Sequence, residues 1–391
     1  MLKGVNAESS LEKLKEIWKN RPGRARELRS QGRKIIGYFC CYLPVEILTA
    51  ANLVPYRITG SLREPVTVAN VYCDPGICPY LKSCFDMAMK GEYDFLDGWV
   101  AVDSCDSMFN MFKPLDYNIK FPLTYFLDVP VIYDPASIRF FKEELAFFRN
   151  ALEGFTQSKV PDESLLQAIR LHNQNRYLLR ELYQLRKPEP PLLSGSEVTR
   201  MLLGVMSLPV EEANQLLEGA IAEVRERQGG TKRGGARLLI YGPEIDDPML
   251  HELIEDVGAT VVADDTCIGS RFFLHDVEET ADPLDGLAYR YLAKIYCPKT
   301  IRGQGEGGWS TRQADLEERF GHIRDLATDH NVNGVILYIM RFCDNHQYDV
   351  PDLRDYLEGE GFPVLHIESD YTLAAVGALR TRIQAFVETI S

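Results

Sequence analysis

Hydrophobic and polar positions in the first third of the chain alternate between two patterns. Short apolar runs such as Ile35–Phe39 and Gly98–Val102 are typical of buried strands, and the amphipathic stretch Pro79–Lys90 indicates a helix between them. Strands that alternate with helices in this way predict a parallel sheet. The predicted strands of this part are 35–39, 54–59, 98–102 and 123–129, and the predicted helices are 45–53, 79–90 and 106–115.

After Pro135 the hydrophobic period changes to about 3.6 residues, which predicts a run of helices, with Ser194 or Ser196 as a cap. The glycine-rich stretch Gly229–Gly235 is interpreted as a linker, because glycine is costly to order. The alternation of strands and helices then returns. The predicted elements are helices at 138–155, 162–185, 196–208 and 210–227, then strands at 237–241, 260–263, 334–340 and 364–367 with helices at 248–257, 283–295, 314–330, 350–359 and 373–390.

These patterns predict an α/β protein with two doubly wound, Rossmann-like parallel-sheet domains joined by a helical segment. Residues 1–33 are expected to form a leader of one helix and an arginine-rich connector. The first α/β domain would cover 34–135, the helical connector with its linker 136–235, and the second α/β domain 236–391.

Composition and charge narrow the class of protein. A chain of 391 residues with 45% hydrophobic and 26% charged residues is globular, and its net charge of −14 argues against nucleic acid as a partner. We expect no contact with a membrane, because no apolar run reaches the roughly eighteen residues that a membrane helix needs. The start at Met1 has no signal-peptide pattern, so a cytoplasmic protein is expected. The basic stretch Lys13–Lys34 is interpreted as a solvated helix and loop, with a docking surface for an acidic or phosphate-bearing partner as the alternative.

Cysteines gather where the first predicted sheet would present its carboxyl edge. Cys40 ends one predicted strand, Cys105 ends another, and Cys78 precedes a helix. Strand ends meet at one edge of an open α/β sheet, where helix N-termini add positive charge, so these three thiols are expected to converge. Their spacing fits neither a zinc ribbon nor a ferredoxin, which leaves buried core cysteines as the alternative. The six cysteines between residues 37 and 106 are Cys40, Cys41, Cys73, Cys78, Cys84 and Cys105.

Other candidate residues carry weaker signals. Glu46, Asp103 and Asp106 lie near strand ends and are possible proton donors or, alternatively, solvated carboxylates. His346 is expected at the surface rather than in a site. The Gly303–Gly308 segment follows no strand, so it is interpreted as a mobile loop rather than a phosphate-binding one.

Six motifs, in order along the chain from about residue 34 to the end, resemble one known family. The motifs are Cys40-x-Tyr42-x-Pro44-x-Glu46, Cys78-Pro79-Tyr80-Leu81-Lys82-Ser83-Cys84, Ser104-Cys105-Asp106, Asp264-Asp265-Thr266-Cys267-x-Gly269-x-Arg271, Arg341-Phe342-Cys343-Asp344 and Glu368-x-Asp370. Together they are similar to the iron–sulfur subunits of benzoyl-CoA reductases and 2-hydroxyacyl-CoA dehydratases. The motif at 264–271 and the sequence Tyr296-Cys297-Pro298 resemble the small catalytic subunit of the reductases more than the dehydratases.

The resemblance implies a [4Fe-4S] cluster held by Cys40, Cys78 and Cys105, with Cys41, Cys84 and Cys343 as further candidate ligands. A larger, double-cubane cluster would draw on further thiols, with Cys297 and Cys343 the most favoured. The implied substrate is a coenzyme A thioester. Arg271 would contact a CoA phosphate or, alternatively, pair with Asp264 or Asp265.

The resemblance also implies an activity and partners. The chain would work as a heterodimer with a paralogous iron–sulfur subunit, served by an ASKHA-type activator ATPase that binds ATP and Mg, with ferredoxin as upstream electron donor. The expected reaction is the ATP-dependent reduction of benzoyl-CoA to the cyclic dienoyl-CoA by single-electron, radical steps. The alternatives are an (R)-2-hydroxyacyl-CoA dehydratase subunit, a double-cubane reductase, or a non-catalytic partner subunit.

Overall fold

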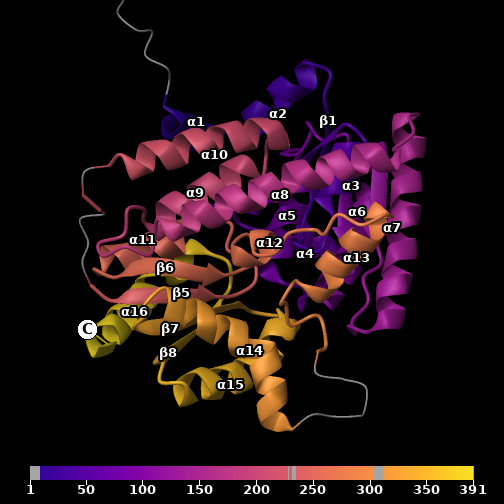
Figure 1. Ribbon diagram of the computed structural model, residues 1–391. Coiled ribbons are helices and arrows are strands. Elements are labelled where there is room, and N and C mark those ends of the chain that lie inside the picture. The colour runs from indigo at the N-terminus through magenta and orange to yellow at the C-terminus, as the bar shows by residue number, and fades with distance from the viewer. Residues whose placement is uncertain (1–8, 228, 231–234, 303–310, 391) are drawn as a thin grey trace, which may run out of the picture.

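Two four-stranded sheets form the frame of the protein in a computed structural model that describes residues 9–227, 229–230, 235–302 and 311–390 (Figure 1). The first sheet contains β1 (Lys34–Tyr38), β2 (Leu53–Arg57), β3 (Gly98–Val102) and β4 (Leu123–Leu127), and the second contains β5 (Arg237–Tyr241), β6 (Thr260–Asp265), β7 (Gly334–Met340) and β8 (Val364–Ser369). All paired strands are parallel. The predicted fold class is therefore confirmed.

Both sheets have the same strand order. It is β2-β1-β3-β4 in the first and β6-β5-β7-β8 in the second. The order reverses direction between β1 and β3, and again between β5 and β7. In doubly wound sheets such a reversal opens a crevice outside the carboxyl ends of the two strands, and ligands bind there.

The helices of the two α/β halves largely follow the predicted pattern. Two of them, α4 (Ala69–Tyr72) and α12 (Ser270–Phe273), were not predicted, because four residues are too few to show a helical period. The other helices are α3 (Val45–Ala50), α5 (Pro79–Met89), α6 (Asp106–Asn118), α11 (Met249–Asp256), α13 (Pro283–Ala293), α14 (Arg312–Asp329), α15 (Asp344–Gly359) and α16 (Val376–Ile390), with a 3₁₀ turn at Leu373–Ala375.

One boundary differs in a way that matters for the site. The sequence predicts that a helix starts at Val350, because Pro351 suits a first helical turn. In the structure α15 begins at Asp344, with Cys343 as its N-cap and Pro351 inside it. The earlier start places Cys343 and His346 in the first turn of this helix.

The N-terminal segment corrects a second prediction. The arginine-rich part is not a connector but a second helix, α2 (Arg21–Ser30), after α1 (Ser10–Lys19), and Asn20 caps it. Arg21 is buried and donates to Thr59 Oγ1 at 2.9 Å and to the carbonyl of Arg57. Other arginines of α2 pair with Asp94, Asp97 and Glu212. These contacts within the chain favour a docked helix over a free binding surface.

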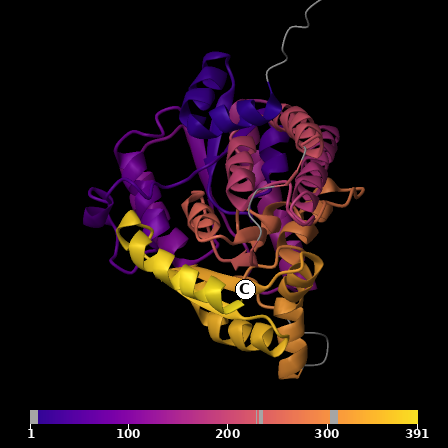
Figure 2. The ribbon, with the colours of Figure 1, turned by 90° about the vertical axis from the view of Figure 1, so that its left-hand side faces the viewer.

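A helical segment crosses both halves. It consists of α7 (Pro135–Thr156), α8 (Asp162–Gln184), α9 (Gly195–Val205) and α10 (Val210–Arg225), and Ser194 caps α9 in a capping box with Glu197. In Figure 1, α8, α9 and α10 lie across the molecule, with α10 beside α1 and α8 beside α3. Figure 2 shows α1 and α2 (indigo) at one end of the molecule and α16 (yellow) toward the other.

Two segments from the sequence analysis lie wholly or mainly outside the described residues. They are the Gly303–Gly308 loop and most of the Gly229–Gly235 linker. None of the helices in the described ranges is both long enough and apolar enough to cross a bilayer.

Close strand packing makes Gly98 a test of the first sheet. A Cβ at this position would lie 2.6 Å from the carbonyl oxygen of Leu123 on the neighbouring strand. We expect Gly98→Ala to destabilise the protein by about 1–3 kcal/mol, measured by urea denaturation, because the strand backbone would have to shift. The matched control is Gly154→Ala on α7, where nothing lies within 4 Å of the new Cβ. There alanine should stabilise the helix by roughly 0.5–1 kcal/mol, and equal effects at both positions would contradict this account of the packing.

Candidate functional site

Six cysteines line one cavity between the carboxyl edges of the two sheets. The cavity has a volume of about 80 Å³, and its walls also include Phe39, Ser104, Pro243 and Met340. We call it the cysteine cavity. Its cysteines are Cys40, Cys78 and Cys105 from the first half and Cys267, Cys297 and Cys343 from the second half.

Local structure explains why the thiols meet here. Cys40 follows β1 and Cys267 follows β6, whereas Cys78, Cys105 and Cys343 are the N-caps of α5, α6 and α15. A helix N-terminus carries partial positive charge, which stabilises a thiolate. The cavity therefore has three such helix ends at its wall.

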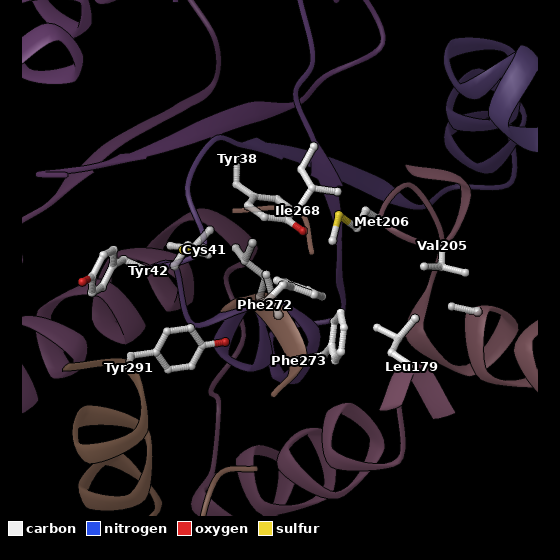
Figure 3. Close-up of a cluster of buried hydrophobic side chains, with 14 of the residues drawn as sticks. Tyr38, Cys41, Tyr42, Leu179, Val205, Met206, Ile268, Phe272, Phe273 and Tyr291 are labelled. Carbon is white, nitrogen blue, oxygen red and sulfur yellow. The ribbon is translucent and has the colours of Figure 1, made fainter. Parts of the chain in front are cut away.

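The structure brings together the three cysteines that were expected to converge, Cys40, Cys78 and Cys105. Two other candidate ligands lie close by but do not line the cavity. Cys41 is fully buried among the aromatic side chains of Tyr42, Phe272 and Tyr291, as Figure 3 shows, and it does not line the cavity. Cys84 is also fully buried, in a second hydrophobic cluster.

Cys73 does not line the cavity either. Cys267, by contrast, lines the cavity although it was not among the expected ligands. Its place just after a predicted strand was the signal that could have identified it.

Burial controls the charge of most of these thiols. It raises the pKa of Cys78 to about 11 and that of Cys105 to about 12. Cys40 and Cys267 differ, because hydrogen bonds from Cys41 lower the pKa of Cys40 to about 7 and also lower the pKa of Cys267. Without a cation in the cavity, most of its thiols therefore remain neutral at pH 7.

The arrangement of the thiols bears on whether the cavity suits a single metal ion or a metal group of several atoms. Within the described ranges, no three His, Cys, Asp or Glu side chains are grouped so as to hold a single metal ion. The six thiols instead surround a space. Such an arrangement suits a multi-atom group bound through thiolates better than one ion, which needs its ligands around a point.

Glu244 is a cavity residue that sequence reasoning missed. It lies just after β5, and its Oε1 accepts a hydrogen bond from the fully buried Arg57, whereas its Oε2 is buried and has no hydrogen-bond partner. Burial raises the pKa of the Glu244 carboxyl above its usual value, although Arg57 favours the charged form. Glu244 is thus a carboxyl group at the cavity wall that can hold a proton.

The expected proton donors are placed differently. Glu46 is fully buried on α3, where Arg176 and Tyr291 both donate to its carboxylate. Burial disfavours its charge, but Arg176 and neighbouring cationic groups outweigh this and lower the pKa of Glu46 to about 2. At pH 7 Glu46 has no proton to give, so its surroundings argue against the predicted role. Asp106 is exposed in the first turn of α6.

Arg271 and His346 form a buried pair beside the cavity. Arg271 donates to Asp265 Oδ2 at 3.1 Å, which matches the ion-pair alternative for this residue. His346 is 3% exposed and accepts from Arg271 at 2.9 Å, so the prediction that it lies at the surface is wrong. The spacing of the histidines in the sequence does not predict this buried contact, because the place of His346 depends on the early start of α15.

A family model described as 2-hydroxyglutaryl-CoA dehydratase, D-component, matches residues 40–390. The chain belongs to this family. The resemblance drawn from the six sequence motifs is therefore confirmed. The match includes the helical segment, the second half and all of the first half after β1.

Known relatives of the chain include enzyme subunits of two reaction classes. The β subunit of (R)-phenyllactyl-CoA dehydratase from Clostridium sporogenes is 25% identical over 93% of this chain and 94% of its own length. A benzoyl-CoA reductase subunit from Thauera aromatica is 27% identical over 92% of this chain and 91% of its own length. The putative dehydratase subunit YjiM of Escherichia coli (strain K12) is 27% identical over 93% of each chain. The similar identities leave dehydratase and reductase undistinguished.

The ion pair of Glu46 gives a test based on pH. We expect Glu46→Gln to destabilise the protein by about 3 kcal/mol at pH 7, because it leaves Arg176 buried without a counter-charge. The pKa of Glu46 is lower in the folded protein, about 2, than its ordinary value of 4.5. Its stabilising effect is thus complete above pH 4.5 and is lost as the pH falls toward 2.

Denaturant titrations at pH 7 and pH 3 measure this effect. The difference between wild type and Glu46→Gln should shrink at the lower pH. The control is Glu12→Gln, which removes an exposed pair with Lys15 and should change stability very little. A difference that stays constant with pH would contradict an ionised Glu46.

Proposed function

We propose that this chain is an iron–sulfur subunit of an ATP-dependent acyl-CoA reductase of the benzoyl-CoA reductase type. The observation that carries the proposal is the cysteine cavity, in which thiols from both α/β halves line one common space. Thiolates are the protein ligands of iron–sulfur clusters, and the helix N-termini at Cys78, Cys105 and Cys343 favour their charged form. A cluster bound there would supply single electrons.

The residues of the chain then have separate tasks. Cys40, Cys78 and Cys105 would hold the cluster, and the mainly apolar wall around them would exclude water. Glu244 would hold a proton at the cavity wall on its Oε2, which has no hydrogen-bond partner, whereas both carboxylate oxygens of Glu46 already accept hydrogen bonds. The substrate would be a coenzyme A thioester, as the names of the relatives suggest.

Partners belong to the proposal as well. The relatives are named as subunits, which supports a heteromeric complex with a paralogous iron–sulfur subunit. An activator ATPase would deliver the electrons, with ferredoxin as their source. ATP and Mg would bind to that partner, in the cytoplasm.

A second candidate is favoured by the number of thiols. A single cluster held by three cysteines uses only half of the six that line the cavity. The double-cubane alternative would also use Cys267, Cys297 and Cys343, and so would give every cavity thiol a role. Both candidates share the same cavity and differ in iron content.

Metal analysis of protein purified without oxygen, together with its co-purifying partner, tests the site. We expect about four irons and as many acid-labile sulfides per chain for a single cluster, or about eight irons for the larger one, with an EPR signal after reduction. Cys105→Ala should lower the iron content sharply. Cys73→Ala is the matched control, because Cys73 lies outside the cavity. Absence of iron under strictly anaerobic handling would refute the proposal.

The reaction class needs its own measurement. A reductase spends electrons on every turnover, so we expect ATP hydrolysis to rise in proportion to product. A dehydratase recycles its electron, so ATP would be needed only for activation. The ratio of ATP hydrolysed to product formed in the reconstituted complex, measured over many turnovers, separates the two. A ratio that falls toward zero would contradict the reductase assignment.

A further inference from the structure

A chain of buried hydrogen bonds ends at one sulfur of the cysteine cavity. Asp265 Oδ2 accepts from Arg271 Nη2 at 3.1 Å, and Arg271 Nη1 lies 2.9 Å from His346 Nε2. The other ring nitrogen, His346 Nδ1, lies 3.3 Å from Cys343 Sγ. Asp265, Arg271 and His346 are each less than 5% exposed. The proposed function assigns no task to this series of hydrogen bonds.

The guanidinium of Arg271 is held in one orientation. Its Nη2 also donates to the carbonyl of Asp265 at 3.0 Å, and its Nη1 donates to the carbonyl of Gly242 at 2.9 Å. The ring of Tyr241 lies under the guanidinium carbon, 4.9 Å from the centre of the ring. Arg271 therefore presents a fixed N–H to His346.

This fixed donor decides which ring nitrogen of His346 carries the proton. A guanidinium has five N–H donors and no acceptor, so His346 Nε2 must accept. The proton of the neutral ring is then on Nδ1, the nitrogen that faces Cys343. In this tautomer an oriented N–H donor faces the sulfur of Cys343.

We propose that His346 is a positioning residue that, held in its Nδ1–H form by Arg271, donates a hydrogen bond to the sulfur of Cys343 and so tunes whatever that sulfur binds. Where the bound group is a cluster, the inference rests on the second candidate of the proposed function, in which Cys343 is a ligand. A hydrogen bond to a ligating sulfur withdraws electron density and raises the reduction potential of an iron–sulfur centre. Cys343 would accordingly be a functional thiol rather than a core cysteine.

Two substitutions separate this role from simple packing. In His346→Asn the side-chain amide can place an N–H near the position of Nδ1, and in His346→Gln the longer amide reaches the position of Nε2 instead. Asparagine therefore keeps the donor to Cys343, whereas glutamine keeps the contact with Arg271 but loses that donor. Both variants are polar and close in size, so a purely structural role predicts the same effect for both.

The first experiment needs no cluster. Protein with ¹⁵N-labelled histidine, freed of iron and shown to be folded by circular dichroism, is studied by NMR, and the signals of residue 346 are assigned by their loss in His346→Asn. We expect chemical shifts of the Nδ1–H form. An Nε2–H form would overturn the inference, whatever the outcome of the metal analysis.

The second experiment measures the midpoint potential of the reconstituted cluster by EPR-monitored redox titration. We expect His346→Asn to stay near wild type. His346→Gln should make reduction at least tenfold less favourable, a shift of about 59 mV to more negative potential for a one-electron couple. Equal potentials in the two variants at equal iron content would overturn the inference.

A protein that binds no iron refutes the proposed function instead, and the NMR result then decides the hydrogen bond to Cys343 alone.

Discussion

The structure depends on one constraint: the carboxyl edges of two parallel sheets face each other. Each sheet reverses its strand order at the middle, so each has a crevice at the same relative place. The residues after β1 and β3 meet those after β5 and β7, and the cysteine cavity lies where they meet. Every other feature of the site, from the helix N-termini to the buried Arg271, follows from this arrangement.

Buried ion pairs fix the distance between the two halves. Helix α8 joins them, because Arg176 pairs with Glu46 of the first half, while Arg186, just after the helix, pairs with Asp264 of the second. Arg57 reaches across to Glu244 at the cavity itself. Such pairs add little net stability compared with apolar packing, but each is costly to break. They therefore define one geometry for the cavity more than they strengthen the fold.

The sequence was a good guide to the fold, because strands buried on both faces and long amphipathic helices leave clear periodic patterns. It also placed Cys40, Cys78 and Cys105 correctly at strand and helix ends. It was a poor guide where function depends on contacts between the halves. Nothing in the local pattern shows that Glu46 meets Arg176 across 130 positions, or that Glu244 meets Arg57.

His346 illustrates the same limit at short range. Proline at position 351 is a common first-turn residue, and it concealed the start of α15 about a turn and a half earlier. The contact of His346 with Cys343 depends on that start, so one misplaced boundary hid a buried histidine. Local sequence patterns carry no signal for pairs that form across a domain interface. Where a proline follows the true start of a helix, the pattern predicts the wrong start.

The equal division of the cavity thiols has a further consequence. Three come from each half, so a group that binds all six is held by the first and the second half together. Its binding free energy would add to the docking of the halves, since a ligand stabilises only the state that can bind it. Binding of the cofactor and docking of the two halves would then be thermodynamically coupled. Without the cofactor, the two halves would be held together less tightly.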